Sequence, residues 1–116
     1  MERVGYLMVP CNRDGMVGQM AGTADPDDLL FFAFTPTEQA AIAPLMKAFE
    51  REFAFDSAGR TAEQLIDTRY AALAADIARD FARNAHDEGT AAAANRVADA
   101  LDAALDYGSY TEFAFD

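Results

Sequence analysis

The side chains best suited to chemistry in this chain are carboxylates, and several of them recur at helical spacing. Asp99, Asp102 and Asp106 would share about 60° of one helix surface. Asp76 and Asp80 stand four residues apart, which would place them on one face of an earlier helix. Carboxylates grouped in this way either hold a hard cation or present negative charge to a basic partner.

A metal site is the less favoured of these two uses. Mg²⁺ and Ca²⁺ need oxygen ligands that converge from several elements, whereas the helical aspartates are predicted on outer faces. Asp25, Asp27 and Asp28 lack the spacing of a calcium-binding loop and are better explained as a turn or a helix N-cap. One cysteine and one histidine are too few for a structural zinc site. We therefore expect no metal.

Nucleophilic catalysis would have to use His86 or Cys11, the only residues of their types. His86 is predicted in the last turn of a helix, away from the apolar stripe, where a cation suits the helix dipole. Cys11 has no basic cluster nearby to activate its thiol, apart from Arg13. The chain also lacks the glycine-rich motifs that cradle phosphate. The sequence therefore predicts a protein that is not an enzyme and binds no cofactor.

The balance of charge narrows the classes of partner. Twenty acidic residues against nine basic ones give a net charge of −11. Binding to nucleic acid or to an anionic membrane depends on Lys and Arg, so the sequence argues against both as direct partners. Residues 14–46 hold five acids and no base, and residues 84–116 hold seven acids and only Arg96, whereas residues 47–83 are nearly balanced.

The excess negative charge therefore comes from the two flanking regions. In the balanced segment, Asp76 with Arg79 and Asp80 with Arg83 are spaced to form local ion pairs. If the flanking regions adjoin, their acids form one or two continuous negative faces, and we expect a partner to bind there. The predicted partner-binding residues are Asp25, Asp27, Asp28, Asp99, Asp102, Asp106, Glu112 and Asp116.

The elements that must position these acids begin with strands. Residues 3–10 carry β-branched and aromatic residues and end at a proline, which predicts a strand. Residues 12–15 have turn composition, and residues 16–20 are predicted to return as a second strand. Residues 29–34 are a short apolar run, which is either a buried strand or part of a short helix capped by Asp25.

The first of three predicted helices begins at a capping box, in which Thr35 and Glu38 satisfy each other's backbone N–H groups. An apolar stripe follows from Ile42 to Phe53. Pro44 lacks an N–H but projects away from that stripe, so we expect a kink rather than a break.

Two further helices follow in the sequence. Residues 61–64 resemble a second capping box and are followed by an apolar stripe, so a helix is predicted from there to about His86. Thr90 is predicted to cap the third helix, residues 91–106, and Gly108 to end it in the left-handed conformation. The stripe of the second helix comprises Ile66, Tyr70, Leu73, Ile77 and Phe81.

The tail, residues 110–116, alternates between apolar and polar positions, with Thr111, Phe113 and Phe115 on one side. This pattern predicts a half-buried strand that joins the N-terminal sheet. The expected fold class is α+β: a small antiparallel sheet, made of the N-terminal strands plus the C-terminal strand, packed against three α-helices. Residues 1–116 are expected to form a single domain.

These features favour a small, non-enzymatic protein inhibitor that binds a basic surface of a partner, such as a nucleic-acid-binding protein or nuclease. Carboxylates along a helix can stand in for phosphates, and charge steering speeds the encounter. In charge profile alone the chain resembles DNA-mimic inhibitors, phage anti-CRISPR proteins and the immunity proteins that block nuclease toxins.

A second interpretation is a structural or assembly module whose acidity serves solubility, as on salt-adapted surfaces. Exposed phenylalanines of the tail strand would then pair two copies edge to edge in a homodimer. The single cysteine suits a reducing compartment, and the sequence shows neither a membrane-spanning apolar run nor a signal peptide pattern. A cytoplasmic location is expected.

Overall fold

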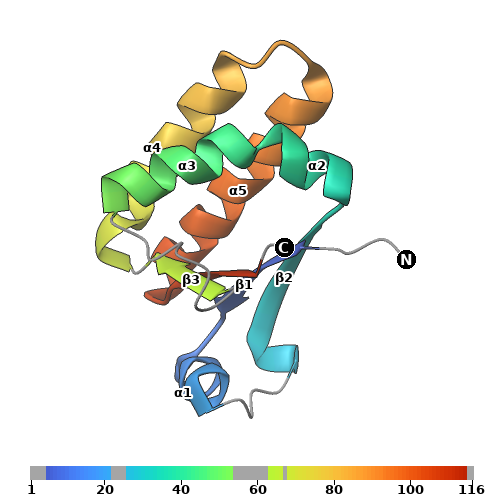
Figure 1. Cartoon of the computed structure of the whole chain (residues 1–116). Coiled ribbons are helices and arrows are strands. Elements are labelled where there is room, and N and C mark those ends of the chain that lie inside the picture. The colour runs from blue at the N-terminus through green and yellow to red at the C-terminus, as the bar shows by residue number, and fades with distance from the viewer. Residues whose placement is uncertain (1–4, 22–25, 54–62, 67, 115–116) are drawn as a thin grey trace.

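The computed structural model describes residues 5–21, 26–53, 63–66 and 68–114. Strands and helices alternate along this chain and share one core, which confirms the predicted α+β class (Figure 1). The described residues form five α-helices instead of the predicted three. In chain order the elements are β1 (Gly5–Pro10), α1 (Arg13–Ala21), the 3-10 turn η1 (Pro26–Asp28), β2 (Leu29–Phe34), α2 (Pro36–Ala41), α3 (Ala43–Phe53), β3 (Glu63–Ile66), α4 (Thr68–Arg83), α5 (Glu88–Tyr107) and β4 (Thr111–Ala114).

The four strands form one antiparallel sheet in the order β2-β1-β4-β3. The N-terminal strand and its pairing with the tail strand are as predicted. Of the two structures considered for residues 29–34, a strand or part of a short helix, the strand is the one that forms. The tail strand is not an edge, however, because β1 and β3 pair on either side of β4. Phe113 is only 3% exposed, so the predicted pairing of two copies through this strand is wrong.

The core lies between one face of the sheet and the helices. Alternate residues of the strands point to this side, as the pleat requires, and Leu7, Val9, Phe34 and Phe113 are all buried there. Helix α5 packs directly on β1, β2 and β4, while α4 packs against α5. Helices α2 and α3 complete this layer by contacting α5 and α4, respectively (Figure 1).

Helices α4 and α5 meet through alanines. Ala74 and Ala78 of α4, and Ala94 and Ala98 of α5, are fully buried. Small side chains let two helix backbones approach closely, so the alanine face of α4 is buried in preference to its bulkier stripe. The predicted stripe is partly wrong as core, because Tyr70 and Leu73 remain exposed and Ile77 and Phe81 are half-buried.

Helix α2 begins as predicted, but it does not continue through Pro44. The Thr35–Glu38 capping box is present with both of its hydrogen bonds. Ile42 is the C-cap of α2, and α3 begins at the next residue. The predicted single helix is therefore interrupted here, where only a kink was expected. Proline cannot donate to the preceding turn, but near the start of a new helix no such bond is required. The stripe from Ile42 to Phe53 does pack against the core.

Helix α1 replaces the second strand predicted for residues 16–20. The side chain of Asn12 accepts a hydrogen bond from the Gly15 N–H at 2.7 Å, and its carbonyl accepts one from the Met16 N–H. This N-cap converts the expected turn into the start of a helix. Gly15 is required at this point, because a Cβ there would collide with the Asp28 carbonyl oxygen.

Strand β3 occupies part of the predicted second capping box. Thr61 lies outside the described residues, while Glu63 and Gln64 belong to the strand and pair with β4. Pairing along an open strand edge outweighs the local helix signal in this segment. Helix α4 begins later, at Thr68, whose hydroxyl donates to the Ser109 carbonyl just before β4.

Helix α5 starts three residues earlier than predicted. Asp87 is its N-cap and accepts hydrogen bonds from both the backbone N–H and the hydroxyl of Thr90, at 2.8 and 2.9 Å. The backbone bond from Thr90 lowers the pKa of Asp87. His86 lies in the loop before this cap rather than in a last helical turn. Gly108 ends the helix in the predicted left-handed conformation, with φ of 62°.

Candidate functional site

The three regularly spaced aspartates lie along the outer side of α5. Asp99 and Asp106 are exposed, and Asp102 is half-buried. Arg79 of α4 reaches across to them, with its Nη2 atom 2.6 Å from Asp102 and 3.5 Å from Asp99. The predicted local pairing of Arg79 with Asp76 is thus replaced by an interhelical one, because α5 places two carboxylates within reach of the guanidinium.

The neighbouring side of α4 extends this surface. Asp76 and Asp80 are exposed, and Asp80 forms the predicted ion pair with Arg83. Asp76 lies three residues before Arg79 and four before Asp80, so helix geometry makes it the neighbour of both side chains. We call this surface the acidic face; its carboxylates are those of Asp76, Asp80, Asp99, Asp102 and Asp106, and its guanidiniums are those of Arg79 and Arg83.

The two arginines neutralise the acidic face only in part. The Arg79 pairs are solvent-exposed, with 63% of the Asp99 side chain and 46% of the Asp102 side chain accessible. Exposed ion pairs contribute only about 0.2–1 kcal/mol, so a stronger partner can compete for their carboxylates. A negative excess therefore remains on a surface that two packed helices hold in place.

The second predicted group of acids does not join this surface. Asp25 lies outside the described residues, and η1 stands beside α1 at the start of β2, away from α4 (Figure 1). Asp28 has a structural role, because its carboxylate accepts a hydrogen bond from the Asn12 side chain at 2.8 Å and its carbonyl accepts one from the Cys11 N–H. Asp27 is exposed.

The remaining predicted acids also fall elsewhere. Asp116 lies outside the described residues. Glu112 lies in the interior strand β4 and is only 8% exposed, so it cannot reach a partner without unfolding of its surroundings. Its charge and burial together raise the pKa of Tyr110, burial being the larger cause. The Tyr110 hydroxyl donates to the Met16 carbonyl at 3.4 Å and so links the sheet to α1.

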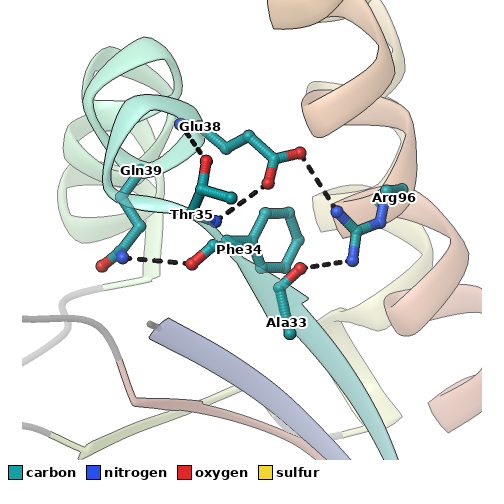
Figure 2. A network of polar contacts seen from close by, with 6 residues as sticks. All are labelled: Ala33, Phe34, Thr35, Glu38, Gln39 and Arg96. Carbon is teal, nitrogen blue, oxygen red and sulfur yellow. Dashed lines mark hydrogen bonds and ion pairs between the residues drawn. The ribbon is translucent and has the colours of Figure 1, made fainter. Parts of the chain in front are cut away.

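A polar network around Arg96 was not anticipated from the sequence (Figure 2). The guanidinium of Arg96 donates to Glu38 at 3.1 Å and to the carbonyl of Ala33, and it stacks over the Phe34 ring at 4.5 Å. Glu38 in turn accepts from the Thr35 N–H at 2.9 Å, which is the main cause of its lowered pKa. The one feature of the sequence that could have drawn attention to this network is that Arg96 is the only basic residue in residues 84–116.

The groups considered for catalysis are not brought together. His86 is exposed in the α4–α5 loop, whereas Cys11 is half-buried after β1. Among the described residues, no three His, Cys, Asp or Glu side chains are placed to hold a metal ion. The exposed side of α3 carries an open hollow of about 450 Å³, lined by Pro44, Lys47, Glu50 and Arg51.

Comparisons of this chain with protein-family models, with curated proteins and with solved structures find no match. Within the described ranges, none of the helices has the length and apolar character needed to span a bilayer.

Proposed function

We propose that this protein is a small, non-enzymatic inhibitor that acts in the cytoplasm by docking the acidic face onto a basic surface of a partner protein. That surface would normally bind nucleic acid, as on a nuclease or another nucleic-acid-binding protein. The observation that carries the proposal is the line of Asp99, Asp102 and Asp106 along the outer side of α5, a helix whose opposite side is buried in the core.

The geometry of α5 suits this role. From Asp99 to Asp106 the helix rises about 10 Å, which gives a short line of negative charge comparable to a stretch of phosphate backbone. The negative end of the helix dipole lies at the same end as Asp106 and adds to the field. Because the helix is held on one side by the sheet and α4, little conformational entropy is lost when the carboxylates bind.

The test compares two double charge reversals in the full chain. A partner is first captured from lysate of the native host at low salt and identified after elution with salt, and its affinity for the pure protein is then measured. Asp99→Lys with Asp106→Lys is expected to abolish binding. The matched control, Glu50→Lys with Glu52→Lys on α3, makes the same change in net charge and is expected to retain it.

Two further observations would decide the mechanism. Duplex DNA or RNA should compete with this protein for the partner, and affinity should fall steeply with added salt. Binding that is independent of salt, or that both double variants weaken equally, would exclude docking through the acidic face.

A further inference from the structure

Helix α4 exposes an apolar strip made of Tyr70, Leu73 and Ile77. The helix buries its alanine face, so these larger side chains are left outside, with Tyr70 39% exposed, Leu73 49% exposed and Ile77 half-buried. The three residues follow one another at intervals of three and four, which makes them neighbours on the helix surface. Single exposed apolar residues are ordinary, whereas a contiguous group of them is typical of an interaction site.

A series of stacked rings holds the aromatic end of the strip in place. The centroid of the Tyr70 ring lies 5.5 Å from that of Phe53 in α3. Phe53 lies 5.9 Å from Phe49, which in turn contacts the buried ring of Phe113 in β4 at 6.0 Å. Aromatic pairs at these separations stabilise each other, so Tyr70 is fixed before any partner arrives. A side chain that is already fixed loses little conformational entropy when it is covered.

Carboxylates border the strip directly. Asp76 lies three residues after Leu73, and Asp80 lies three residues after Ile77, so helix geometry makes both aspartates neighbours of the strip. Both are exposed. Asp80 pairs with Arg83 at the surface, whereas the Asp76 carboxylate forms no ion pair within the described part of the chain. An occupant of the strip must therefore bring positive charge to this side.

Arg69 gives the strip a direction. Its guanidinium stacks over the Tyr70 ring, 4.7 Å from the centroid, so a positive charge already lies at the end of the strip where α4 begins. Asp76 and Asp80 place negative charge further along the helix. Only one orientation of a charged partner avoids setting like charges against each other.

The geometry points to a basic amphipathic helix as the occupant of this strip. The inference rests on the proposed function and adds the kind of element by which the partner is recognised. A helix presents apolar side chains at intervals of three and four, which matches the spacing of the strip, while its Lys and Arg side chains lie over Asp76 and Asp80. The acidic face attracts any basic surface, whereas the strip favours one that carries apolar side chains at the contact. The strip therefore confers specificity.

Calorimetric titration of the full chain with synthetic peptides tests this occupant. The probe is a peptide of about 18 residues made of leucine and lysine, with the leucines at helical spacing. Its controls are a scrambled peptide of the same composition and a peptide in which glutamate replaces lysine. We expect the probe to bind, and both controls to bind more weakly by about tenfold or more. Equal binding of the scrambled peptide would overturn the helix, and equal binding of the glutamate peptide would overturn the charge complementarity.

A matched pair of variants locates the site. Leu73→Gln should weaken binding of the probe by about tenfold, because it removes the most exposed side chain of the strip without changing the charge. Leu105→Gln on α5 makes the same change at a leucine that is 42% exposed, and it should bind as the wild type does. Equal effects of the two variants would overturn the proposal.

A measurement on the wild type covers the case in which Leu73→Gln fails to fold, which circular dichroism would reveal. The methyl NMR signals of Leu73 and Ile77 should shift when the probe is added, and those of Leu105 should not. Unchanged signals at Leu73 and Ile77 in the presence of bound probe would show that the strip is not the site.

Comparison with the captured partner separates this inference from the proposed function. If Asp99→Lys with Asp106→Lys abolishes partner binding and Leu73→Gln leaves it unchanged, docking through α5 holds and this inference is wrong. If only Leu73→Gln lowers the affinity, the strip is the site and docking through α5 is wrong. Because each copy carries a net charge of −11, we expect the protein alone to sediment as a monomer. A dimer that Leu73→Gln dissociates would make a second copy the occupant and overturn the basic helix.

Discussion

Asp106 is placed where a carboxylate costs stability. It lies in the last turn of α5, which carries no basic residue, and the helix dipole there favours a cation. An exposed carboxylate at the negative end of a helix dipole fits a role in binding better than a role in folding. Among the predicted acids, Asp28 shows the opposite pattern, since its contacts with Asn12 and Cys11 hold α1 in place.

Replacement of Asp106 by lysine should therefore stabilise the fold while it weakens partner binding. We expect the free energy of unfolding to rise by about 0.3–1 kcal/mol at low ionic strength, because a cation replaces an anion at the negative end of the helix. Urea denaturation measures the change. Asp76→Lys, in the middle of α4, is the control for net charge and should have a smaller effect. A decrease in stability would contradict the explanation that the helix dipole makes a carboxylate unfavourable at this position.

Glu38 should make stability depend on pH. Hydrogen bonding from Thr35 and the charge of Arg96 hold its pKa below the ordinary 4.5. A carboxylate with a lowered folded-state pKa stabilises the fold fully above the unfolded-state value, and that contribution is lost as pH falls through the folded-state value. The destabilisation caused by Glu38→Gln should therefore be largest near neutral pH and shrink in acid. Urea melts of the wild type and of Glu38→Gln at a series of pH values measure this, and a difference that does not shrink in acid would contradict the prediction.

Among the elements, the close packing of α4 on α5 depends on alanine. Ala78 is fully buried in this interface, whereas Ala72 on the same helix is exposed to solvent. Any larger side chain in this interface must push the two backbones apart. The acidic face depends on the same packing, because Arg79 of α4 and Asp102 of α5 form their ion pair across this interface, at 2.6 Å.

Ala78→Leu should consequently destabilise the fold by about 1–3 kcal/mol, the usual cost of overpacking a core. Ala72→Leu makes the same chemical change outside the interface and should be nearly neutral. Chemical denaturation of the two variants gives the comparison. If the two free energies of unfolding were equal, the alanine interface would not be as tight as the structure has it.

The sequence predicted those elements whose signals are local. The Thr35–Glu38 box and Gly108 act within a single turn, and the tail alternates clearly. The sequence was misleading where long-range packing decides. The apolar stripe through Leu73 indicated a buried face, but small alanines allowed α5 to approach on another side. Strand β3 forms because β4 offers it an edge, which no pattern within residues 63–66 reveals.

The candidate site was predicted in part for the same reason. Helical spacing is enough to group Asp99, Asp102 and Asp106, since that grouping needs only the geometry of one helix. Whether Glu112 is accessible depends on the strands beside it, and whether Arg79 turns to Asp76 or to Asp102 depends on how α4 and α5 pack. Tertiary contacts of this kind are not encoded in any short stretch of sequence.

At the scale of the whole molecule, the acidic face and the exposed aromatic pair of Tyr6 and Phe31 are separated. The acidic face lies on α4 and α5, while the aromatic pair lies on the far side of the sheet. Added salt screens the attraction of the acidic face to a basic partner, whereas the aromatic pair carries no charge to be screened. A salt titration of partner affinity therefore tests docking through the acidic face separately from any role of this apolar surface.

The position of β4 also sets the order in which the fold can close. The sheet places β1 next to a strand about a hundred residues later in the sequence, and β4 fills the gap between β1 and β3. Until residues 111–114 are in place, β1 can pair only with β2, and β3 has no partner strand among the described residues. The α4–α5 hairpin, by contrast, needs only local contacts. In refolding, the helical hairpin should therefore form early and the complete sheet late.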